Sequence, residues 1–283
     1  MPTVAGALRQ ARRRLQAHSD SADLDARLLL AHTLGVSTTR LFTAPQAGIE
    51  SADWVHFKRL IERRAAGEPL AYISGRCGFW TLELAVDPSV LIPRPDTETL
   101  VATALELLPQ QHITIADLGT GSGAIALALA SERPQWSVTA TDASQPALAC
   151  AQHNAANLQL TQVHFVHGNW FEPLNGQRFD AIVSNPPYIA ADDTHLRAPE
   201  LGHEPTQALV ADDHGLAALA HIAGHAGAHL HPGGWLLLEH GFEQGDAVCN
   251  LLHAAGLISV QTRRDLGGRS RVTLGRQRPS TGS

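Results

Sequence analysis

The sequence predicts an α/β protein in which a small helical domain precedes a mostly parallel sheet of seven strands. Up to Gly67, apolar residues recur at helical spacing. After His112, strand-like runs alternate with helix-like runs, which is typical of a parallel sheet with helices on both faces. Two strand-like runs follow one another at the end of the chain, so we expect an antiparallel hairpin at that edge of the sheet.

The helical domain is expected at residues 1–75. Its buried helix faces are predicted to carry Leu24, Leu28, Ala31, Trp54, Phe57 and Ile61. Ser21 and Ser51 precede these two apolar stripes, and serine is a preferred N-cap residue. Arginines on the polar faces of these helices are interpreted as solvated charges.

A hairpin linker is expected at residues 76–95, where glycine and proline interrupt strand-like runs. The α/β domain should then cover residues 96–276, followed by a disordered tail at 277–283. The predicted strands lie at residues 113–118, 137–142, 163–168, 179–184, 234–240, 257–264 and 271–276. The predicted helices between them lie at residues 122–132, 145–157, 213–230 and 243–255, and a further helix begins near Asp96.

Composition excludes several classes of protein. The chain has 283 residues, of which 44% are hydrophobic, but no apolar run reaches the roughly 18 residues that span a bilayer. A soluble, cytoplasmic protein is therefore expected. The formal net charge of −6 argues against an extended nucleic-acid surface, which is usually basic. Three cysteines far apart indicate neither a disulfide framework nor a zinc site, and no metal site is expected.

A nucleotide-type site is indicated where the first strands of the α/β domain end. The run "ADLGTGSGAIALALA" passes through Gly119, Gly121 and Gly123 into a helix, so backbone and helix N-terminus can approach a ligand closely. Asp142 ends the next strand, where a carboxylate can accept hydrogen bonds from ribose hydroxyls; it could instead cap the following helix. Trp170 could stack on an adenine or belong to the core. From these residues alone, NAD is not excluded.

The fourth strand ends in an unusual way, with "IVSNPPYIA". Two prolines cannot continue a hydrogen-bonded strand, and their fixed φ makes the turn stiff. They place the carboxamide of Asn185 and the carbonyl of Pro186 at the edge of the sheet where ligands bind in this class of fold. A rigid pair of acceptors beside a nucleoside site is what S-adenosylmethionine-dependent methylation of an NH2 group requires.

The order of "LIPRPDTE", "DLGTGSGAIALALA", "GNWFEPL", "VSNPPYI" and "LLLEHG", behind a helical domain, resembles the bacterial release-factor glutamine methyltransferases of the PrmC/HemK type. The resemblance covers nearly the whole chain. It implies a class I methyltransferase domain, with a Rossmann-like fold, that uses S-adenosyl-L-methionine. The implied substrate is the glutamine of the Gly-Gly-Gln loop in class 1 peptide chain release factors, which is methylated on its side-chain nitrogen.

The resemblance also implies roles for individual residues. The implied cofactor contacts are Gly119, Thr120, Gly121, Ser122, Gly123, Asp142, Trp170 and Asn185. The implied substrate contacts are Asn185, Pro186, Pro187 and Tyr188, of which Asn185 and Pro186 are catalytic. In this reading Asn185 Oδ1 and the Pro186 carbonyl accept the two N–H groups of the glutamine amide and direct its lone pair toward the methyl group.

Two further expectations follow from this reading. If Asn185 acts only as an acceptor, an aspartate at this position should retain some activity. The helical domain should dock the release factor, and the enzyme should act as a monomer without contacting nucleic acid directly. The main alternative is an adenine N6 or cytosine N4 methyltransferase, because a similar Pro-Pro-aromatic motif serves exocyclic amines of bases.

Overall fold

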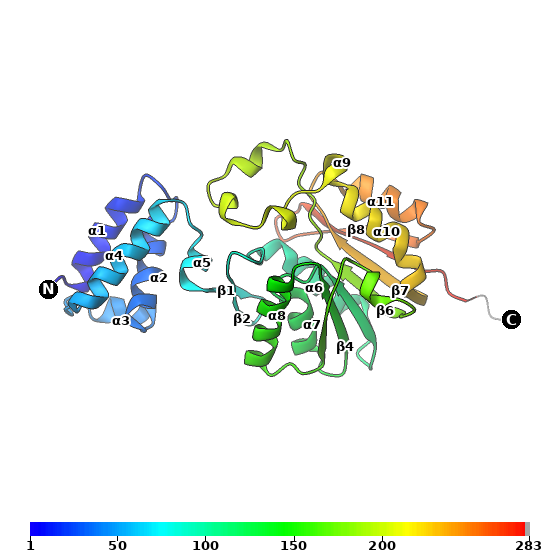
Figure 1. The fold of residues 1–283 in the computed structure, drawn as a ribbon, viewed down its shortest axis with the longest axis horizontal. Helices are drawn as coiled ribbons and strands as arrows, with labels where there is room; N and C mark the ends of the chain where they lie inside the picture. The colour runs from blue at the N-terminus through cyan, green and yellow to red at the C-terminus, as the bar shows by residue number, and fades with distance from the viewer. Residues whose placement is uncertain (281–283) are drawn as a thin grey trace. The chain divides into compact units, whose positions relative to one another are not determined.

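The computed structural model describes residues 1–280, which form two compact units (Figure 1). The first unit comprises Met1–Arg76 together with the short segment Arg197–His203, and the second comprises Cys77–Leu196 and the chain from Glu204 onward. Within the described residues, no helix has both the length and the apolar character of a membrane span. Of the predicted tail, residues 281–283 lie outside the described part, whereas Gln277 pairs through its backbone with Gly234.

The first unit is helical. Its helices are α1 (Val4–Leu15), α2 (Ala22–Leu34), α3 (Thr38–Thr43), α4 (Ser51–Ala65) and α5 (Leu70–Ser74). Helices α1, α2 and α4 pack against one another around a core that includes Leu15, Leu29 and Phe57. Gly35 ends α2 in a left-handed conformation, which satisfies the last carbonyls of the helix.

The buried face of α2 differs from the prediction. Leu24 and Leu28 are exposed, and the core is instead formed by Ala26, Leu29 and Leu30. Neighbouring apolar residues on this helix allow more than one stripe at helical spacing, so the pattern alone selected the wrong one. The predicted N-cap at Ser51 is also wrong, because Glu50 precedes the helix and Ser51 is its first residue.

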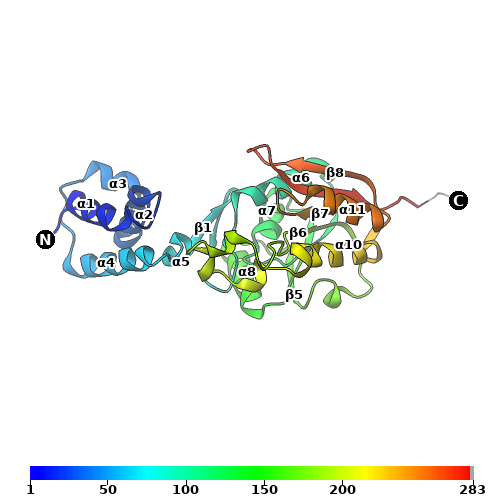
Figure 2. The ribbon, with the colours of Figure 1, turned by 90° about the horizontal axis from the view of Figure 1, so that it is seen from above.

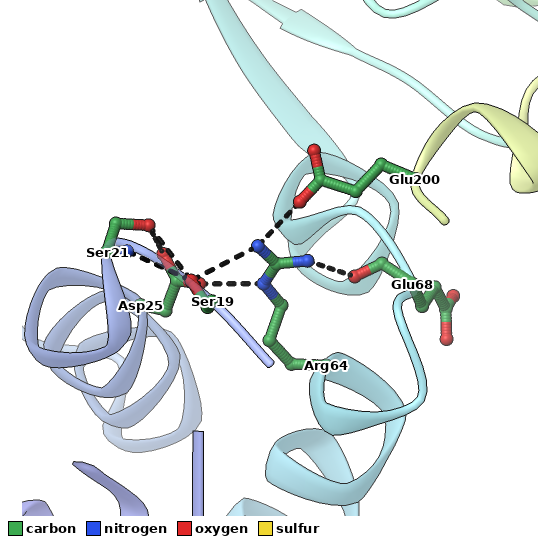
Figure 3. A network of polar contacts seen from close by, with 6 residues as sticks. All are labelled: Ser19, Ser21, Asp25, Arg64, Glu68 and Glu200. Atoms are coloured by element: carbon green, nitrogen blue, oxygen red, sulfur yellow. Dashed lines mark hydrogen bonds and ion pairs between the residues drawn. The ribbon is translucent and has the colours of Figure 1, made fainter. Parts of the chain in front are cut away.

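A buried ion pair holds α2 and α4 together (Figure 3). Arg64 Nε lies 2.7 Å from Asp25 Oδ2, and both side chains are almost fully buried. The hydroxyls of Ser19 and Ser21 donate to the Asp25 carboxylate at 2.8 Å. Arg64 also contacts Glu200, from the segment 197–203 of the same unit, at 2.6 Å. Each charge in the pair is therefore compensated where water cannot reach it.

The second unit begins with a hairpin of β1 (Arg76–Phe79) and β2 (Leu82–Ala85), whose residues Phe79 and Leu84 are buried in the core of this unit. A 3-10 turn, η1 (Pro95–Thr97), leads into α6 (Glu98–Leu107). The alternating elements that follow are β3 (Thr114–Leu118), α7 (Ala124–Glu132), β4 (Ser137–Asp142), α8 (Gln145–Leu158), β5 (Val163–His167), η2 (Glu172–Leu174) and β6 (Phe179–Ser184).

A long excursion follows β6 and contains the short turns η3 (Thr194–Arg197), η4 (Leu201–His203) and η5 (Thr206–Ala208), then α9 (Asp212–Gly215). The last elements are α10 (Ala217–His229), β7 (Leu230–Glu239), α11 (Gly245–Ala254), β8 (Ile258–Arg264) and β9 (Ser270–Arg276). The predicted helix start at Asp213 is wrong, because Asp213 and His214 have left-handed backbone angles and the regular helix begins at Ala217.

Within residues 1–280, seven strands form the main sheet in the order β5-β4-β3-β6-β7-β9-β8. Strands β3 to β7 are parallel, whereas β9 is antiparallel to both β7 and β8, so the predicted sheet and edge hairpin are confirmed. Side chains alternate between the two faces of the sheet, whose strands and covering helices are seen from above in Figure 2. Ile115 and Val183 pack with α6 and α7, while Leu118 and Ile182 pack with α10 and α11.

The strand order locates the ligand crevice of this unit. The chain proceeds outward from β3 through β4 to β5, and then returns to place β6 on the other side of β3. In open α/β sheets, ligands bind at the carboxyl ends of the strands where the order reverses. The crevice is therefore expected beyond Leu118 and Ser184, the last residues of β3 and β6.

Replacing Arg64 should test the buried ion pair. We expect Arg64→Ala to lower the free energy of unfolding of the helical unit by about 3 to 5 kcal/mol, because Asp25 is left charged and buried. Arg14→Ala is the matched control: Arg14 pairs with Glu62 at the surface, where water screens the charges, so its loss should lower stability far less. Urea denaturation measures both. Equal effects of the two substitutions would contradict this account.

Candidate functional site

A cavity of about 280 Å³ opens at the carboxyl ends of β3, β4, β5 and β6. It is lined by Ser89, Val90, Leu91, Gly119, Gly121, Asp142, Ala143, Ser144, Ala147, Asn169, Trp170, Asn185, Pro187, Pro205, Gln207 and Ala208. The wall is mainly apolar, with a few polar groups from strand ends, as is usual in small-molecule sites.

The glycine-rich loop after β3 is held by backbone contacts with the end of β4. The N–H groups of Gly119 and Thr120 both donate to the carbonyl of Thr141 at 2.9 Å. Gly121 has φ +56°, and a side chain added there would meet no atom within 4 Å. Because Gly121 also lines the cavity, a ligand can approach its backbone closely.

Asp142 stands at the end of β4 and lines the cavity. Its carboxylate accepts the N–H of Gly121 at 2.9 Å and the N–H of Ser144 at 2.8 Å. Ser144, not Asp142, is the N-cap of α8, since its hydroxyl accepts the N–H of Ala147. Each carboxylate oxygen still has a free lone pair, so Asp142 can also accept hydrogen bonds from the hydroxyls of a ligand.

Trp170 lies between the core and the cavity. It follows β5 with φ +47°, and its carbonyl accepts the Thr141 hydroxyl at 3.2 Å. A Cβ added to Gly119 would lie 3.2 Å from the Trp170 ring, so the ring packs directly on the glycine loop. Because Trp170 also lines the cavity, part of its indole is available to a flat ligand.

Asp117 is a buried acid beneath the loop. The Thr120 hydroxyl donates to its Oδ2 at 2.6 Å, whereas Oδ1 has no hydrogen-bond partner among the described residues. Complete burial raises the pKa of this carboxyl to about 7, despite the hydrogen bond from Thr120. The carboxyl therefore anchors the loop from below and does not itself reach the cavity.

The "NPPY" turn after β6 is fixed beside the glycine loop. The Ser184 hydroxyl donates to the carbonyl of Leu118 at 2.7 Å, which joins the ends of β6 and β3. Asn185 lines the cavity, and its Nδ2 donates to Thr97 Oγ1 at 3.1 Å. The Tyr188 hydroxyl points to the buried Glu239 at 3.4 Å. Burial raises the Tyr188 pKa, so the phenol stays protonated at neutral pH.

The structure brings some of the predicted site residues to the cavity and leaves others behind it. Gly119, Gly121, Asp142, Trp170, Asn185 and Pro187 line it. Thr120, Ser122, Gly123, Pro186 and Tyr188 are not among the lining residues. Ser122 and Gly123 are buried in the loop, where the carbonyl of Ser122 accepts Asn154 Nδ2 at 2.9 Å.

Two parts of the cavity wall were not expected from the sequence. One is the stretch Ser89–Leu91 after the hairpin, and the other is Pro205–Ala208 in the excursion after β6. Glu204 joins them, because its buried carboxylate accepts the N–H of Ile92 at 3.1 Å and binds Arg94. In the sequence, only the prolines of "LIPRP" and the acid of "HEP" mark these two parts of the wall. Neither pattern by itself indicates a ligand site.

The arrangement suits a nucleoside-type ligand beside an amine or amide. A glycine loop, a carboxylate and an indole surround one part of the cavity, and a stiff turn presents a carboxamide to the same cavity. No group of three or more His, Cys, Asp or Glu residues in the described part of the chain is placed to hold a metal ion.

Comparison with known proteins gives two family matches. Residues 6–75 match the model of the PrmC N-terminal domain, and residues 96–212 match that of the methyltransferase small domain. The fold resembles that of a methyltransferase from Pyrococcus furiosus, with a TM-score of 0.54 and 18% identity, covering 79% of this chain and 98% of that chain. At this identity the likeness shows the fold alone.

Curated relatives cover almost the entire chain. A protein from Xylella fastidiosa (strain Temecula1), named release factor glutamine methyltransferase, is 53% identical over 254 residues, which are 89% of this chain and 92% of the relative. A protein of the same name from Escherichia coli (strain K12) is 46% identical over 269 residues, covering 95% and 97% of the two chains.

The buried Asp117 should make stability depend on pH in a defined direction. Its folded pKa of about 7 exceeds the usual 3.8, so the folded state binds the proton more tightly and stability falls as pH rises between these values. Relative to Asp117→Asn, the unsubstituted protein should lose roughly 2 to 3 kcal/mol between pH 5 and pH 8. Urea denaturation at both pH values measures this. The exposed control, Asp192→Asn, should lose as much stability between these two pH values as the unsubstituted protein does. If Asp117→Asn loses the same amount, the pH dependence does not come from Asp117.

Proposed function

Since the chain belongs to the release factor glutamine methyltransferase family, we propose that it transfers a methyl group from S-adenosylmethionine to the side-chain amide nitrogen of a glutamine. The acceptor is proposed to be the glutamine of the Gly-Gly-Gln loop in class 1 release factors. The observation that carries this proposal is that Asn185, from the "NPPY" turn, lines the same cavity as Gly121 and Asp142.

The residues around the cavity fit the proposed cofactor. Gly121 leaves space against its backbone, Asp142 has lone pairs for ribose hydroxyls, and the Trp170 ring presents a flat apolar surface for adenine. When bound, S-adenosylmethionine supplies a methyl group attached to a positively charged sulfur. Gly119, Thr120, Ser122 and Gly123 would contribute through the shape of the loop, and Asn185 would face both ligands.

The "NPPY" turn is proposed to prepare the substrate amide for attack. An amide nitrogen is a weak nucleophile because its lone pair is delocalised into its own carbonyl. Asn185 Oδ1 and the Pro186 carbonyl each accept one N–H, which orients the nitrogen and stabilises the positive charge that develops on it. The fixed φ angles of Pro186 and Pro187 keep these acceptors in place. Pro187, which lines the cavity, and Tyr188, the next residue of the turn, would contact the substrate amide.

The helical unit is proposed to dock the release factor. Leu24 and Leu28 on α2 are exposed at 51% and 37%, and Phe42 on the adjacent α3 is exposed at 63%. Arg27 lies over the Phe42 ring at 5.2 Å, so an aromatic and a cation share this surface. Exposed apolar groups of this kind often mark protein interaction sites. This surface, formed by Leu24, Leu28 and Phe42, is called the docking surface below.

Class 1 release factors act in translation, so we propose that the enzyme is cytoplasmic and acts on them as a monomer. The alternative, methylation of adenine N6 or cytosine N4, is disfavoured by the net charge of −6. Incubation with labelled cofactor and either release factor or DNA separates the two. Mass spectrometry should find the methyl group on the glutamine of the Gly-Gly-Gln loop, and methylated DNA with unmodified release factor would overturn the proposal.

Replacing Asn185 tests the acceptor role. We expect Asn185→Ala to lower kcat about 10² to 10³-fold, as loss of one preorganised polar contact to a transition state typically does. Asn157→Ala, an exposed asparagine on α8, serves as the control and should leave kcat unchanged. Initial rates on a release factor at saturating cofactor give both values. An Asn185→Ala enzyme with normal turnover would eliminate the acceptor role.

Substituting polar residues into the docking surface should weaken binding of the release factor without changing the methyl-transfer step. The triple change Leu24→Ser, Leu28→Ser and Phe42→Ser is expected to raise KM for intact release factor about tenfold or more. Activity on a short peptide that contains Gly-Gly-Gln should stay the same, because such a peptide lacks the rest of the release factor, which the docking surface is proposed to bind.

The control is Val55→Ser, which alters a residue 62% exposed on α4. It should leave both KM values unchanged. A triple variant with unaltered KM for intact release factor would show that the release factor docks elsewhere.

A further inference from the structure

The backbone carbonyl of Tyr188, at the end of the "NPPY" turn, is held by a side chain from another part of the second unit. Gln244 immediately precedes α11, and its Nε2 donates to the Tyr188 carbonyl at 3.0 Å. Gln244 Oε1 accepts the N–H of Gly241 at 2.8 Å. A backbone N–H can only donate and a carbonyl can only accept, so these two partners fix which way the Gln244 amide faces.

The turn depends on contacts of this kind because its prolines have no N–H to donate. No backbone donor at Pro186 or Pro187 can therefore anchor the turn. Its start is anchored by the Ser184 hydroxyl, which donates to the Leu118 carbonyl at 2.7 Å, and its end is anchored by Gln244. Since the φ angles of both prolines are fixed, holding the two ends restricts the positions of the acceptors between them.

A second segment packs against the same carbonyl. Asp213, His214 and Gly215 all have left-handed backbone angles, which are uncommon for residues other than glycine. A Cβ added to Gly215 would overlap the Tyr188 carbonyl oxygen and would lie 2.9 Å from Gln244 Nε2. Only glycine therefore fits beside this hydrogen bond. Strained backbone of this kind persists where the surrounding structure imposes it, and it is often found at functional sites.

We propose that Gln244 is a positioning residue for methyl transfer, and that Gly215 leaves the room in which its amide reaches the Tyr188 carbonyl. Together they keep the turn in the conformation in which Asn185 Oδ1 and the Pro186 carbonyl accept the glutamine NH2. The proposal rests on the proposed function, in which these two oxygens are the acceptors. Gln244 is not among the residues that line the cavity, so it acts through the turn.

The first test separates the contact with Tyr188 from the contact with Gly241. In Gln244→Glu, the ionised carboxylate still accepts the Gly241 N–H but has no hydrogen to donate to the Tyr188 carbonyl. At about pH 8, with cofactor and release factor saturating, we expect kcat to fall about 10 to 10²-fold, because misplacing reacting groups by about 1 Å can cost the larger factor. The affinity for S-adenosylhomocysteine, measured by calorimetry, should be unchanged because the cofactor cavity is intact.

Gln162→Glu is the matched control. Gln162 is half-buried, as Gln244 is, and its Nε2 also donates to a backbone carbonyl, that of Ala130, at 2.9 Å. Gln162 directly precedes β5, at the end of the strands opposite the cavity. This variant loses the same kind of hydrogen bond and should keep a normal kcat. Urea denaturation checks that both variants are folded.

The second test displaces the Tyr188 carbonyl without altering Gln244. The methyl group of Gly215→Ala would overlap this carbonyl, so we expect kcat to fall by a similar factor while the affinity for S-adenosylhomocysteine is kept. Gly256→Ala is the matched control. Its φ of +82° is close to the +84° of Gly215, but a Cβ at Gly256 would meet no atom within 4 Å. Both variants therefore carry similar backbone strain, and only Gly215→Ala displaces the turn.

The outcomes separate the two proposals. Absence of glutamine methylation by the unsubstituted enzyme would overturn the proposed function. With that activity present, low kcat in Gln244→Glu and Gly215→Ala, with cofactor-product affinity kept, supports the positioning role. Normal kcat in folded Gln244→Glu, equal kcat in the two glycine variants, or loss of cofactor-product affinity in parallel with kcat would overturn the positioning role alone. If Gln244→Glu does not fold, the two glycine variants decide the matter.

Discussion

The site depends on one contact between two parallel strands. The hydroxyl of Ser184, at the end of β6, donates to the carbonyl of Leu118, at the end of β3, at 2.7 Å. The glycine loop follows Leu118 and the "NPPY" turn follows Ser184, so this bond fixes the starting points of both halves of the site. Because the strand order reverses between β3 and β6, a crevice is expected beyond the carboxyl ends of these two strands. A cofactor and a second substrate can therefore meet there without movement of the sheet.

Burial of acidic side chains orients the loop and turn around the site, and it also lowers the stability of the fold. Asp117 lies beneath the glycine loop and Glu239 beneath the "NPPY" turn, and burial raises the pKa of each carboxyl to about 7. Asp117 accepts the Thr120 hydroxyl and Glu239 accepts the Tyr188 hydroxyl, and each leaves one oxygen without a partner among the described residues. Such groups destabilise the fold at neutral pH, yet they orient the loop and turn more strictly than solvated side chains would. Stability and preorganisation are thus opposed at the same residues.

Much of the fold and half of the site can be read from the sequence because they depend on local pattern. Alternating strand and helix runs predicted the sheet, and strand ends predicted that Gly121, Asp142 and Asn185 come together. The stretch Pro205–Ala208 could not be predicted, because it reaches the cavity through contacts of Glu204 with residues more than a hundred positions away. The same limit applies to the contact of Asn185 with Thr97, which exists only when η1 and the end of β6 are packed together.

Errors in the helical unit have a related cause. Leu24 and Leu28 are exposed, although helical spacing predicts them in the core, because the apolar residues of α2 allow more than one stripe at that spacing. The buried side of α2 contains Asp25, whose buried charge is compensated by an ion pair with Arg64 from α4. Because Asp25 and Arg64 are far apart in the sequence, their pairing produces no periodic pattern from which it could be predicted. The surface that the leucines form is consequently a finding of the structure and a reason to assign docking to this unit.

The central claim is that Asn185 Oδ1 and the Pro186 carbonyl hold the substrate amide in the cavity that also receives the cofactor. A crystal structure of the enzyme with S-adenosylhomocysteine and a peptide containing Gly-Gly-Gln tests it most directly. The account predicts that the glutamine NH2 donates to both oxygens, with Asn185 Nδ2 still directed at Thr97. A glutamine amide bound to other groups, or Asn185 turned so that its NH2 faces the substrate, would contradict it.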